Sequence, residues 1–525
     1  MKTTKKLTGI FLTFAIIISV FTCMPVNAGA SATLDPSKMT FEEFLVANFE
    51  NFAQEFDISY YIRNNSAWLR LGRSDIDALI MVIYEEFESV LQDNPHLFHV
   101  ETALDFSYYL DFSVFDISPH YIMTRAQYNS AVVKFNDAVK LALDYAKGAA
   151  NDFEKALLLH DYIVLNTVYD VENLEYMQKN NYEQPLREVS HNAYGALVDG
   201  LAVCDGYARA YAYLLKQVGV ESRFITGIMG GGPHIWNLVK VGGGWFHVDT
   251  TANDPVINGR YDMLGRVNRT YFLISDAELR TQTDESGART HSAWTLPTGI
   301  TANSTVYDGA FIRDINTAVV KLDGFYYWID SINVTGRGAN NNRIVRYNIT
   351  TGSASYVHSF ESIWYLDGTE ASSTYKWDIS SYCGIAAYNG LIYFNTAKDI
   401  RSYNPATGAV EVVNTPANLG GTGNRFIFGL IMQGDTIHYS VRTQAASAGN
   451  MAQVKISTAT QPQPQPQPSA GYTIDDAIII LQFEAGLIAS LTAEQQQRYD
   501  LNNDNIVNIT DAIILLRVIA GLIQL

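Results

Sequence analysis

The sequence is short of cysteine and of positive charge, and each shortage argues against a class of protein. It has 3 cysteines among 525 residues, too few for a framework of disulfide bonds. Its 36 lysines and arginines face 54 aspartates and glutamates, and the formal net charge of −18 argues against nucleic acid and anionic membranes as partners. The sequence also shows no phosphate-binding loop and no cysteine-rich metal motif.

Long apolar runs are scarce as well. The run GIFLTFAIIISVF near the start is shorter than the roughly 20 residues of a membrane-spanning helix. It follows a lysine-bearing start and precedes the small-residue exit VNA, so residues 1–28 predict a secretory signal peptide cleaved after Ala28. We therefore expect a secreted, extracellular protein without a membrane span in its mature chain. The mature chain then holds only Cys204 and Cys383, which fits a protein that works in a reducing environment.

The rest of the chain divides into regions with different sequence patterns. Residues 35–148 mix helical patterns with aromatic runs such as FSYYLDF and predict an α+β helper domain. Residues 149–295 hold the reactive motifs described below. Short aromatic strands with NG, DG and TG turns over 300–458 predict three or so antiparallel sheets, arranged like propeller blades or as an atypical β-domain. Residues 459–468 form an extended Pro/Gln linker, and 469–525 a small helical domain.

Cys204 is the first candidate for chemistry. It opens the stretch CDGYARAYAYLLKQVG, whose apolar residues recur at helical spacing until Gly219 ends the pattern, so it lies at the N-terminal end of a predicted helix. Free backbone amides and the positive end of the helix dipole favour a thiolate at that position. The alternative is a small buried core residue without a chemical role.

A predicted hairpin supplies a base and a carboxylate. In GGGPHIWNLVKVGGGWFHVDTT, alternate residues share a face on either side of a glycine-rich turn. With the turn centred between Val241 and Gly242, His234 lies opposite Asp249 on one face of the sheet. One ring nitrogen of His234 then binds the carboxylate, and the other faces the thiol.

Two other histidines are rival bases. His191 lies upstream of the predicted helix and has no carboxylate in obvious register. His247 shares the predicted face with Asp249, which makes it a neighbour of the site rather than its base.

These segments resemble the transglutaminase-like superfamily of papain-type thiol enzymes, in its bacterial secreted branch. The resemblance covers about residues 150–280 and rests on EKALLLHDYIVLNTVYD, AYGALVDGLAVCDGYARAYAYLL, HIWNLV, GWFHVDTTANDP and YFLISDAEL. It implies an α+β catalytic domain with Cys204 as nucleophile, His234 as base and Asp249 as the orienting acid, and no cofactor for catalysis. His-Ile-Trp stands where the family usually has His-Ala-Trp. For the oxyanion hole, the Cys204 N–H is the natural first donor, and Tyr194 is either a second donor or a packed aromatic.

The chemistry that the resemblance implies is acyl transfer on a protein or peptide substrate. The Cys204 thiolate attacks a carboxamide or peptide carbonyl, His234 protonates the leaving amine, and a thioester remains. Water as acceptor gives a protease or amidase, which we favour, and an amine gives a cross-linking transglutaminase. The competing class is a non-catalytic protein that binds protein or polysaccharide through the cleft and the β-domain.

A calcium loop is the second motif. The sequence DLNNDNIVNITD places oxygen ligands at positions 1, 3, 5, 7, 9 and 12 of such a loop, namely Asp500, Asn502, Asp504, the Ile506 carbonyl, Asn508 and Asp511. Asn505 replaces the usual glycine at the sharp turn, where asparagine tolerates the left-handed backbone. We therefore expect one structural calcium ion.

The helix after this loop repeats an earlier one. TDAIILLRVIAGL echoes DDAIIILQFEAGL at an offset of 35 residues. This duplicated unit, over about residues 469–525, resembles a dockerin, the module that attaches secreted enzymes to cohesin-bearing scaffold proteins in cellulosome-type complexes. In the first copy, the positions that match the loop ligands hold the uncharged side chains of Gln465, Gln467, Ser469 and Thr473, so the first calcium site is absent.

The dockerin resemblance also implies a partner and its contacts. The partner is a cohesin module of a scaffold protein. The contact positions correspond to Ile509 and Thr510 in one copy, and to Ile474 and Asp475 in the other.

Overall fold

The computed structural model of the chain describes residues 3–7, 34–180, 185–257, 261–284, 286–331, 341–361, 364, 382–417, 425–443, 449–456, 474–502 and 506–519. The chain forms two compact units, Met1–Lys455 and Ile456–Leu525. Most of the predicted signal peptide and the whole Pro/Gln linker lie outside the described residues.

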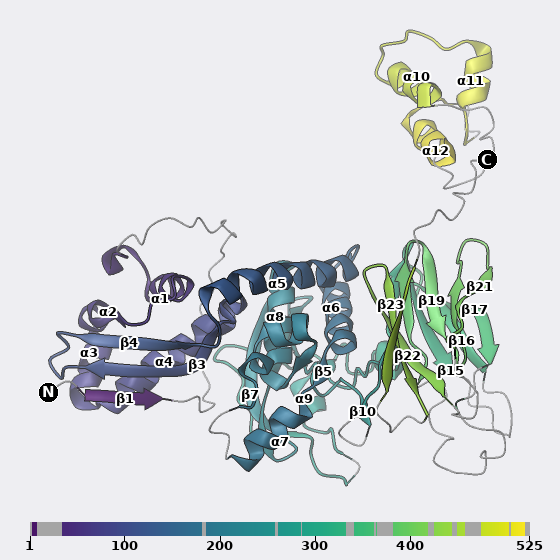
Figure 1. The fold of residues 1–525 in the computed structure, drawn as a ribbon. Helices are drawn as coiled ribbons and strands as arrows, with labels where there is room; N and C mark the ends of the chain where they lie inside the picture. The colour runs from purple at the N-terminus through teal and green to yellow at the C-terminus, as the bar shows by residue number, and fades with distance from the viewer. Residues whose placement is uncertain are drawn as a thin grey trace. The chain divides into compact units, whose positions relative to one another are not determined.

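The helper domain packs helices against strands in the order β3-β4-β2, and β1, which comes from the predicted signal peptide, pairs with β3 at the edge of this sheet (Figure 1). Its longest helix, α4 (Ile76–Asp93), is capped by the Asp75 carboxylate and buries an apolar face that includes Leu79, Ile83 and Phe87. The remaining elements are β1 (Thr3–Leu7), η1 (Pro36–Lys38), α1 (Phe41–Glu50), β2 (Phe56–Asp57), α2 (Ser59–Asn64), α3 (Ser66–Ser74), η2 (Pro95–Leu97), β3 (Val100–Tyr108) and β4 (Phe115–Tyr121).

Helix α5 (Arg125–Tyr145) lies inside the predicted helper domain but packs with helices that follow it. It buries Phe135, Val139 and Ala142 in one core with α6 (Asp152–Asn166) and α8 (Cys204–Gln217). The boundary at residue 148 stays a prediction.

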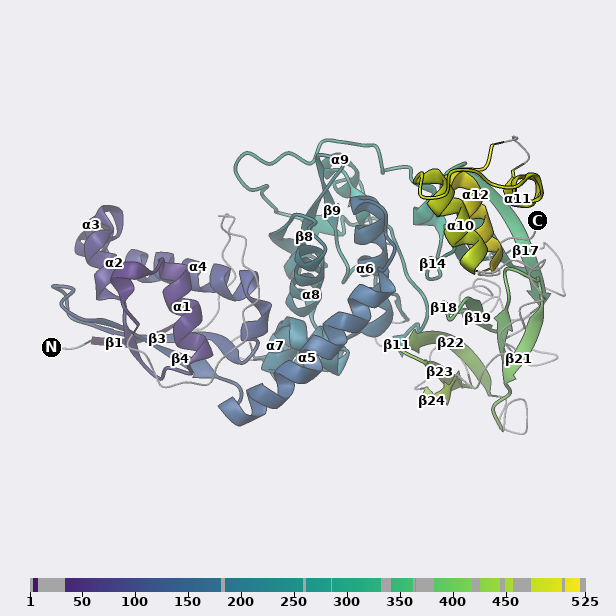
Figure 2. The same ribbon diagram turned by 90° about the horizontal axis from the view of Figure 1, so that it is seen from above.

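The catalytic region is built around a five-stranded antiparallel sheet with the order β12-β9-β8-β7-β13. Helix α8 lies against β8, and α6 lies against α8 (Figure 2). The elements not yet named are β5 (Val168–Tyr169), α7 (Val171–Lys179), η3 (Glu188–His191), η4 (Gly195–Asp199), β6 (Leu201–Ala202), β7 (Ser222–Met229), β8 (Gly232–Val241), β9 (Gly244–Val248), β10 (Val256–Ile257), β11 (Tyr261–Asp262), β12 (Phe272–Ile274), α9 (Asp276–Leu279), β13 (His291–Ser292) and η5 (Phe311–Asp314).

The hairpin of β8 and β9 forms with a different register from the predicted one. Its turn consists of Gly242 and Gly243, both with positive φ (58° and 83°), as a two-residue hairpin turn requires. Val241 pairs with Gly244, so paired positions sum to 485 instead of 483. A shift of two residues keeps every side chain on its predicted face, because side chains alternate with a period of two.

The β-rich region forms three antiparallel sheets within the described residues, and their strands follow one another in chain order. The prediction of antiparallel sheets is confirmed, and the propeller arrangement stays a prediction. The strands are β14 (Val320–Leu322), β15 (Phe325–Ser331), β16 (Asn341–Asn348) and β17 (Ser353–Glu361); β18 (Ile385–Tyr388), β19 (Leu391–Asn395), β20 (Ile400–Tyr403) and β21 (Val410–Asn414); and β22 (Phe426–Gln433), β23 (Thr436–Arg442) and β24 (Asn450–Lys455).

The C-terminal unit contains α10 (Ile474–Glu484), α11 (Ala493–Tyr499) and α12 (Ile509–Ile519). The bounds of α10 and α12 differ by the 35 residues of the sequence repeat. Their buried residues match as well, since Ala477 and Ile480 correspond to Ala512 and Leu515. The predicted duplication is therefore a duplication of packed helices. In the described part of the chain, no helix combines the length and the apolar character of a membrane span.

Candidate active site

Cys204 is the first residue of α8, as the sequence predicts. Val203 caps the helix with extended backbone (φ −101°, ψ −176°), and the thiol lies against Ala208 and Ile235. The side chain is only 9% exposed. The start of α8 therefore presents a cysteine at the positive end of a helix, next to strand β8.

His234 comes from β8 and meets Asp249, the residue that follows β9. Their Nε2 and Oδ2 atoms are 2.7 Å apart, and both side chains are buried. Cys204 lies close enough to His234 to contribute to the raised pKa of its ring. Because Nε2 is engaged by Asp249, Nδ1 is the ring nitrogen left for the thiol. The structure thus places the three predicted side chains near one another, with a direct hydrogen bond between His234 and Asp249.

The electrostatics of His234 favour the charged ring. Burial lowers the pKa of an imidazole, but here the Asp249 charge and hydrogen bond and the contact with Cys204 outweigh it and raise the pKa of His234 to about 10. For Asp249, burial acts to raise the pKa, and the neighbouring imidazoles overcome it, so that its pKa lies well below the usual range. At neutral pH the pair is an imidazolium beside a carboxylate.

Asp249 binds a second imidazole that sequence reasoning missed. His291 Nε2 lies 2.8 Å from Oδ2 of Asp249, the same oxygen that binds His234. Ligand atoms of His234, Asp249 and His291 all lie within 4.8 Å of one another, so the three could also hold a metal ion. His291 lies 42 residues beyond Asp249 on the two-residue strand β13, which offers no periodic pattern to find.

Trp236 and His247 lie beside the site. The Trp236 indole stacks on the His234 ring, and its Nε1 donates to Nδ1 of His247 at 3.0 Å. Nε2 of His247 lies 3.5 Å from Asp276. Trp236 thus connects His247 to His234.

The other predicted candidates have different partners. His191 has no carboxylate in strand register, but its Nδ1 is 2.8 Å from Asp205 on α8. The Tyr194 ring packs against Phe98, with centroids 4.7 Å apart, which gives it the packing role that we weighed against an oxyanion donor.

The His-Asp dipeptide of EKALLLHDYIVL, His160 and Asp161, belongs to a network of buried polar side chains. Asp161 on α6 accepts from Nε of Arg269 at 3.1 Å, and both residues are fully buried. Arg269 also donates to the carbonyls of Ile315 and Thr317, which precede β14. This pair therefore connects α6 to the start of the β-rich region.

His160 extends the same network towards the site. Its Nδ1 binds Asp161 at 3.0 Å, and its Nε2 lies 2.9 Å from the amide of Asn253. The backbone N–H of Asn253 donates to the carbonyl of Asp249 at 3.1 Å. The loop that carries Asp249 is thus anchored to helix α6.

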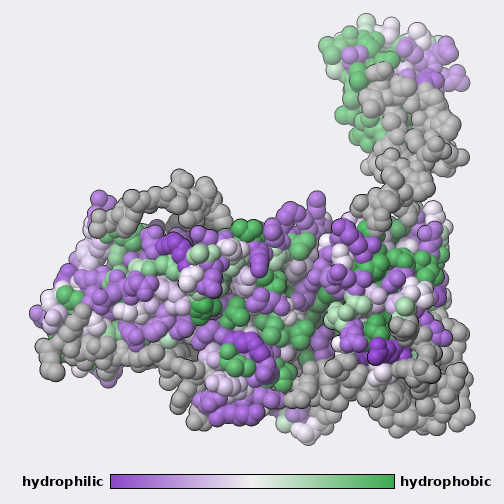
Figure 3. Space-filling view, viewed as in Figure 1, coloured by the Kyte–Doolittle hydropathy of each residue, from purple (hydrophilic) through white to green (hydrophobic). Residues whose placement is uncertain are grey.

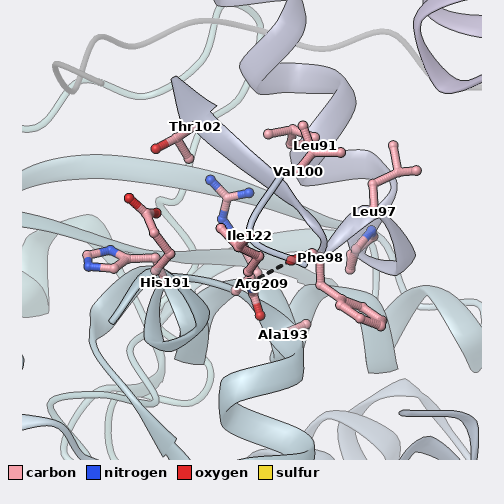
Figure 4. A pocket seen from close by; sticks show the side chains of 12 residues that line it. Leu91, Leu97, Phe98, Val100, Thr102, Ile122, His191, Ala193 and Arg209 are labelled. Atoms are coloured by element: carbon pink, nitrogen blue, oxygen red, sulfur yellow. Dashed lines mark hydrogen bonds between the residues drawn. The ribbon is translucent and has the colours of Figure 1, made fainter. Parts of the chain in front are cut away.

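The helper domain contacts the catalytic helix behind the site. A cavity of about 20 Å³ between them is lined by Leu91 and Thr102 on the helper side and by Glu188, His191 and Arg209 on the catalytic side (Figure 4). Its volume suits roughly one water molecule, so it is no substrate site. Asn192 crosses the boundary and donates to the carbonyl of Phe98 at 3.1 Å.

The predicted calcium loop closes around Asp511. Its Oδ1 accepts from the Leu501 N–H at 2.8 Å and its Oδ2 from the Asn508 N–H at 2.9 Å, which draws both ends of the loop together. Asp500 ends α11, and Asp504 lies outside the described residues. Oxygen ligands alone fit a hard cation such as calcium.

The first copy of the repeat has a different arrangement. Asp476, which corresponds to Asp511, accepts from the Tyr499 hydroxyl at 2.7 Å and pairs with Arg498 at 3.4 Å. The Asp476 carboxylate is thus bound by a hydroxyl and a guanidinium. The corresponding carboxylate in the second copy, Asp511, closes the loop instead. Ile509 and Thr510 are exposed in the first turn of α12, whereas the side chains of Ile474 and Asp475 lie outside the described residues.

Residues 139–250 match the family model of the transglutaminase-like superfamily, and this part of the chain is a transglutaminase-like domain. No curated protein matches the chain. Among solved structures, a TGase is similar at 12% identity and a TM-score of 0.24, over 35% of this chain and 54% of the other. A protein from Cytophaga hutchinsonii described as a candidate cysteine protease is similar at 15% identity and a TM-score of 0.19, over 38% and 70%. The chain thus spans about half the length of the TGase.

Proposed function

We propose that the protein is a secreted thiol enzyme that cleaves or transfers acyl groups of protein or peptide amides. The observation that carries this proposal is the position of His234, which is hydrogen-bonded to Asp249 and lies beside Cys204. A nucleophile, a base and a group that orients the base are the parts that this chemistry requires.

The reaction follows from the geometry. The Cys204 thiolate attacks the amide carbon, and the backbone amides at the start of α8 stabilise the resulting oxyanion. The His234 imidazolium gives its proton to the leaving nitrogen as the C–N bond breaks, which leaves a thioester on Cys204. His234 then takes a proton from water, or from an acceptor amine, as that nucleophile attacks the thioester and frees the thiol.

Alkylation tests the proposal directly. Iodoacetamide should label Cys204 rapidly near neutral pH, and His234→Ala should slow the labelling at least about tenfold because the thiolate loses its imidazolium partner. Cys383 is a matched control, since its thiol is fully buried and burial raises its pKa. Cys383→Ser should label like the wild type. Slow labelling that is insensitive to His234→Ala would favour the non-catalytic binding protein.

Product analysis separates hydrolysis from transfer. Peptide amides incubated with a primary amine should yield free acids if water is the preferred acceptor, and amine adducts if transfer dominates. Cys204→Ala should give neither product. We favour hydrolysis for this chain.

We also propose that the C-terminal unit docks the enzyme, with calcium bound, onto a cohesin of an extracellular scaffold. Ile478 and Leu481 on α10 and their repeat partners Ile513 and Leu516 on α12 are 40–46% exposed, although apolar. Figure 3 shows apolar surface on this unit. Such unpartnered apolar side chains are typical of an interaction surface.

Cohesin binding can be measured with the full chain. Immobilised cohesin should retain the protein in calcium and release it in EDTA. Combining Ile478→Asp with Ile513→Asp should abolish retention while leaving alkylation of Cys204 unchanged. Retention of that double variant would contradict the assigned surface.

A further inference from the structure

We infer that His291 is a positioning residue of the catalytic site, which holds the Asp249 carboxylate ionised and correctly oriented for His234. This inference rests on the proposed function. It adds a fourth residue to the three predicted catalytic ones. This residue lies on β13, which pairs with the edge of β7 that faces away from β8.

The contacts of Asp249 determine the protonation of both rings. An ionised carboxylate oxygen only accepts hydrogen bonds, so both His234 and His291 must carry hydrogen on Nε2, the atoms that lie 2.7 Å and 2.8 Å from Oδ2. The other oxygen, Oδ1, accepts from the Ala252 N–H at 2.9 Å. Three donors therefore hold one buried carboxylate.

The second nitrogen of His291 is also accounted for. Its Nδ1 lies 3.2 Å from the Thr290 hydroxyl, which can donate to it. Both ring nitrogens of His291 therefore have a partner, and the hydrogen on Nε2 is directed at Asp249.

Aromatic packing and burial fix the position of the His291 ring. Its ring lies 5.2 Å from the Trp236 ring and 4.9 Å from the Tyr271 ring, and the side chain is fully buried. The same indole stacks on His234. One aromatic side chain therefore sets the spacing between the two imidazoles that share Oδ2.

The removal of His291 has two expected consequences. Asp249 loses a donor, so its pKa rises, and the carboxylate is free to rotate away from His234. The other titratable groups that feel the charge of Asp249 are His160 and Tyr271, and neither replaces the lost donor on Oδ2. The orientation of His234 towards the thiol should then be less well defined.

Two variants test this role. His291→Leu should lower kcat about 10- to 100-fold with little change in KM, because one charge-assisted hydrogen bond is lost from the reacting groups. The alkaline limb of kcat/KM, which reports His234, should also shift, because Asp249 sets the pKa of that ring. His291→Gln keeps a donor on the side chain and should recover most of both effects.

His120→Leu is the matched control. His120 makes a 2.9 Å hydrogen bond to Asp105 in the helper domain, remote from the site, and its loss should leave kcat and the pH profile unchanged. A His291→Leu enzyme with wild-type kcat and pH profile would overturn the inference. So would equal losses in His291→Leu and His291→Gln at an unchanged alkaline limb, which indicate a structural role only.

Two further measurements distinguish the positioning role from a metal site and from a failure of the proposed function. Stoichiometric zinc in the purified protein, absent from His291→Leu, would overturn the inference because the ring would then be a metal ligand. If wild-type Cys204 resists iodoacetamide, the proposed function itself fails. NMR titration of the histidine rings still tests the His291 contact in that case, since replacement of His291 should change the titration of His234 whether or not the enzyme turns over.

Discussion

The imidazole of His234 stacks on the indole of Trp236, with ring centroids 5.7 Å apart and ring planes inclined by 22°. The same indole donates its N–H to His247. Trp236 therefore orients the base by packing and is itself oriented by a hydrogen bond.

Replacement of Trp236 should separate these two contributions. Trp236→Phe keeps an aromatic ring beside His234 but leaves His247 Nδ1 buried and unpaired, so we expect a loss of about 1–3 kcal/mol of unfolding free energy with a modest loss of activity. Trp236→Ala removes the stack as well and should cost about 3–5 kcal/mol and most of the activity. Urea unfolding and amide hydrolysis measure both. Trp245→Phe, at a partly exposed position on β9, should stay close to the wild type.

The raised pKa of His234 predicts the alkaline limit of activity. Catalysis needs the imidazolium to protonate the leaving amine, so kcat/KM should fall as the pH rises through about 10. Asp249→Asn removes the charge that raises this pKa, so the limit should move to lower pH and kcat should fall about 100- to 10,000-fold. A pH profile of amide hydrolysis measures both effects. An unchanged alkaline limb in Asp249→Asn would contradict the assigned cause.

The same pair should leave a signature in stability. A histidine whose pKa is raised by folding contributes stability that is fully present below its unfolded pKa of about 6.5 and is lost as pH rises through about 10. Melting temperatures should therefore decline over this window in the wild type. In His234→Gln this part of the decline should disappear, whereas in His120→Leu it should persist.

Two carboxyls behind the site should give a dependence of the same sign at lower pH. Burial raises the pKa of Glu88 and of Glu188 to about 7, although Arg209 and His191 respectively oppose the shift. The folded state then holds more protons than the unfolded state above about pH 4.3, so stability should fall as pH rises towards 7. Glu88→Gln should flatten this slope in a melting series from pH 4 to 8. The exposed Glu411 provides Glu411→Gln as a control, which should retain the slope.

The Asp161–Arg269 pair should be one of the most sensitive points of the fold. Arg269→Met leaves a buried carboxylate without its ion partner and should cost about 3–5 kcal/mol. Lys140→Met breaks an exposed ion pair with Asp144 and should cost about 0.5 kcal/mol or less. Chemical unfolding at neutral pH compares the two. Equal costs would contradict the buried role of Arg269.

Calcium binding should depend on one copy of the repeat. Calorimetry on the full protein should show one site, and Asp500→Ala should weaken it by about tenfold or more through the loss of a charged ligand. Asp476→Ala should keep calcium affinity, because Asp476 is bonded to Tyr499 and Arg498. Full affinity in Asp500→Ala would contradict the loop assignment.

Local patterns account for the parts of the site that could be predicted. The start of α8 at Cys204 follows from helical spacing and the stop at Gly219. His234 and Asp249 lie on the same face of the sheet because side chains alternate along a strand. The two-residue error in the predicted register does not change this. The packing partner of α5 did not follow from the sequence, because its apolar face is equally compatible with either neighbouring core.

The sequence by itself determined which elements form and which faces they bury, because helix and strand periods, caps and glycine turns act over a few residues. Only the tertiary structure decided that His291 shares Asp249 with His234, that Asp205 pairs with His191, and that Arg269 reaches Asp161 across 108 residues. Each of these contacts joins segments whose order along the chain carries no spacing rule. Their partners are chosen by the packing of whole helices and sheets, in which a buried charge or imidazole must find a counterpart.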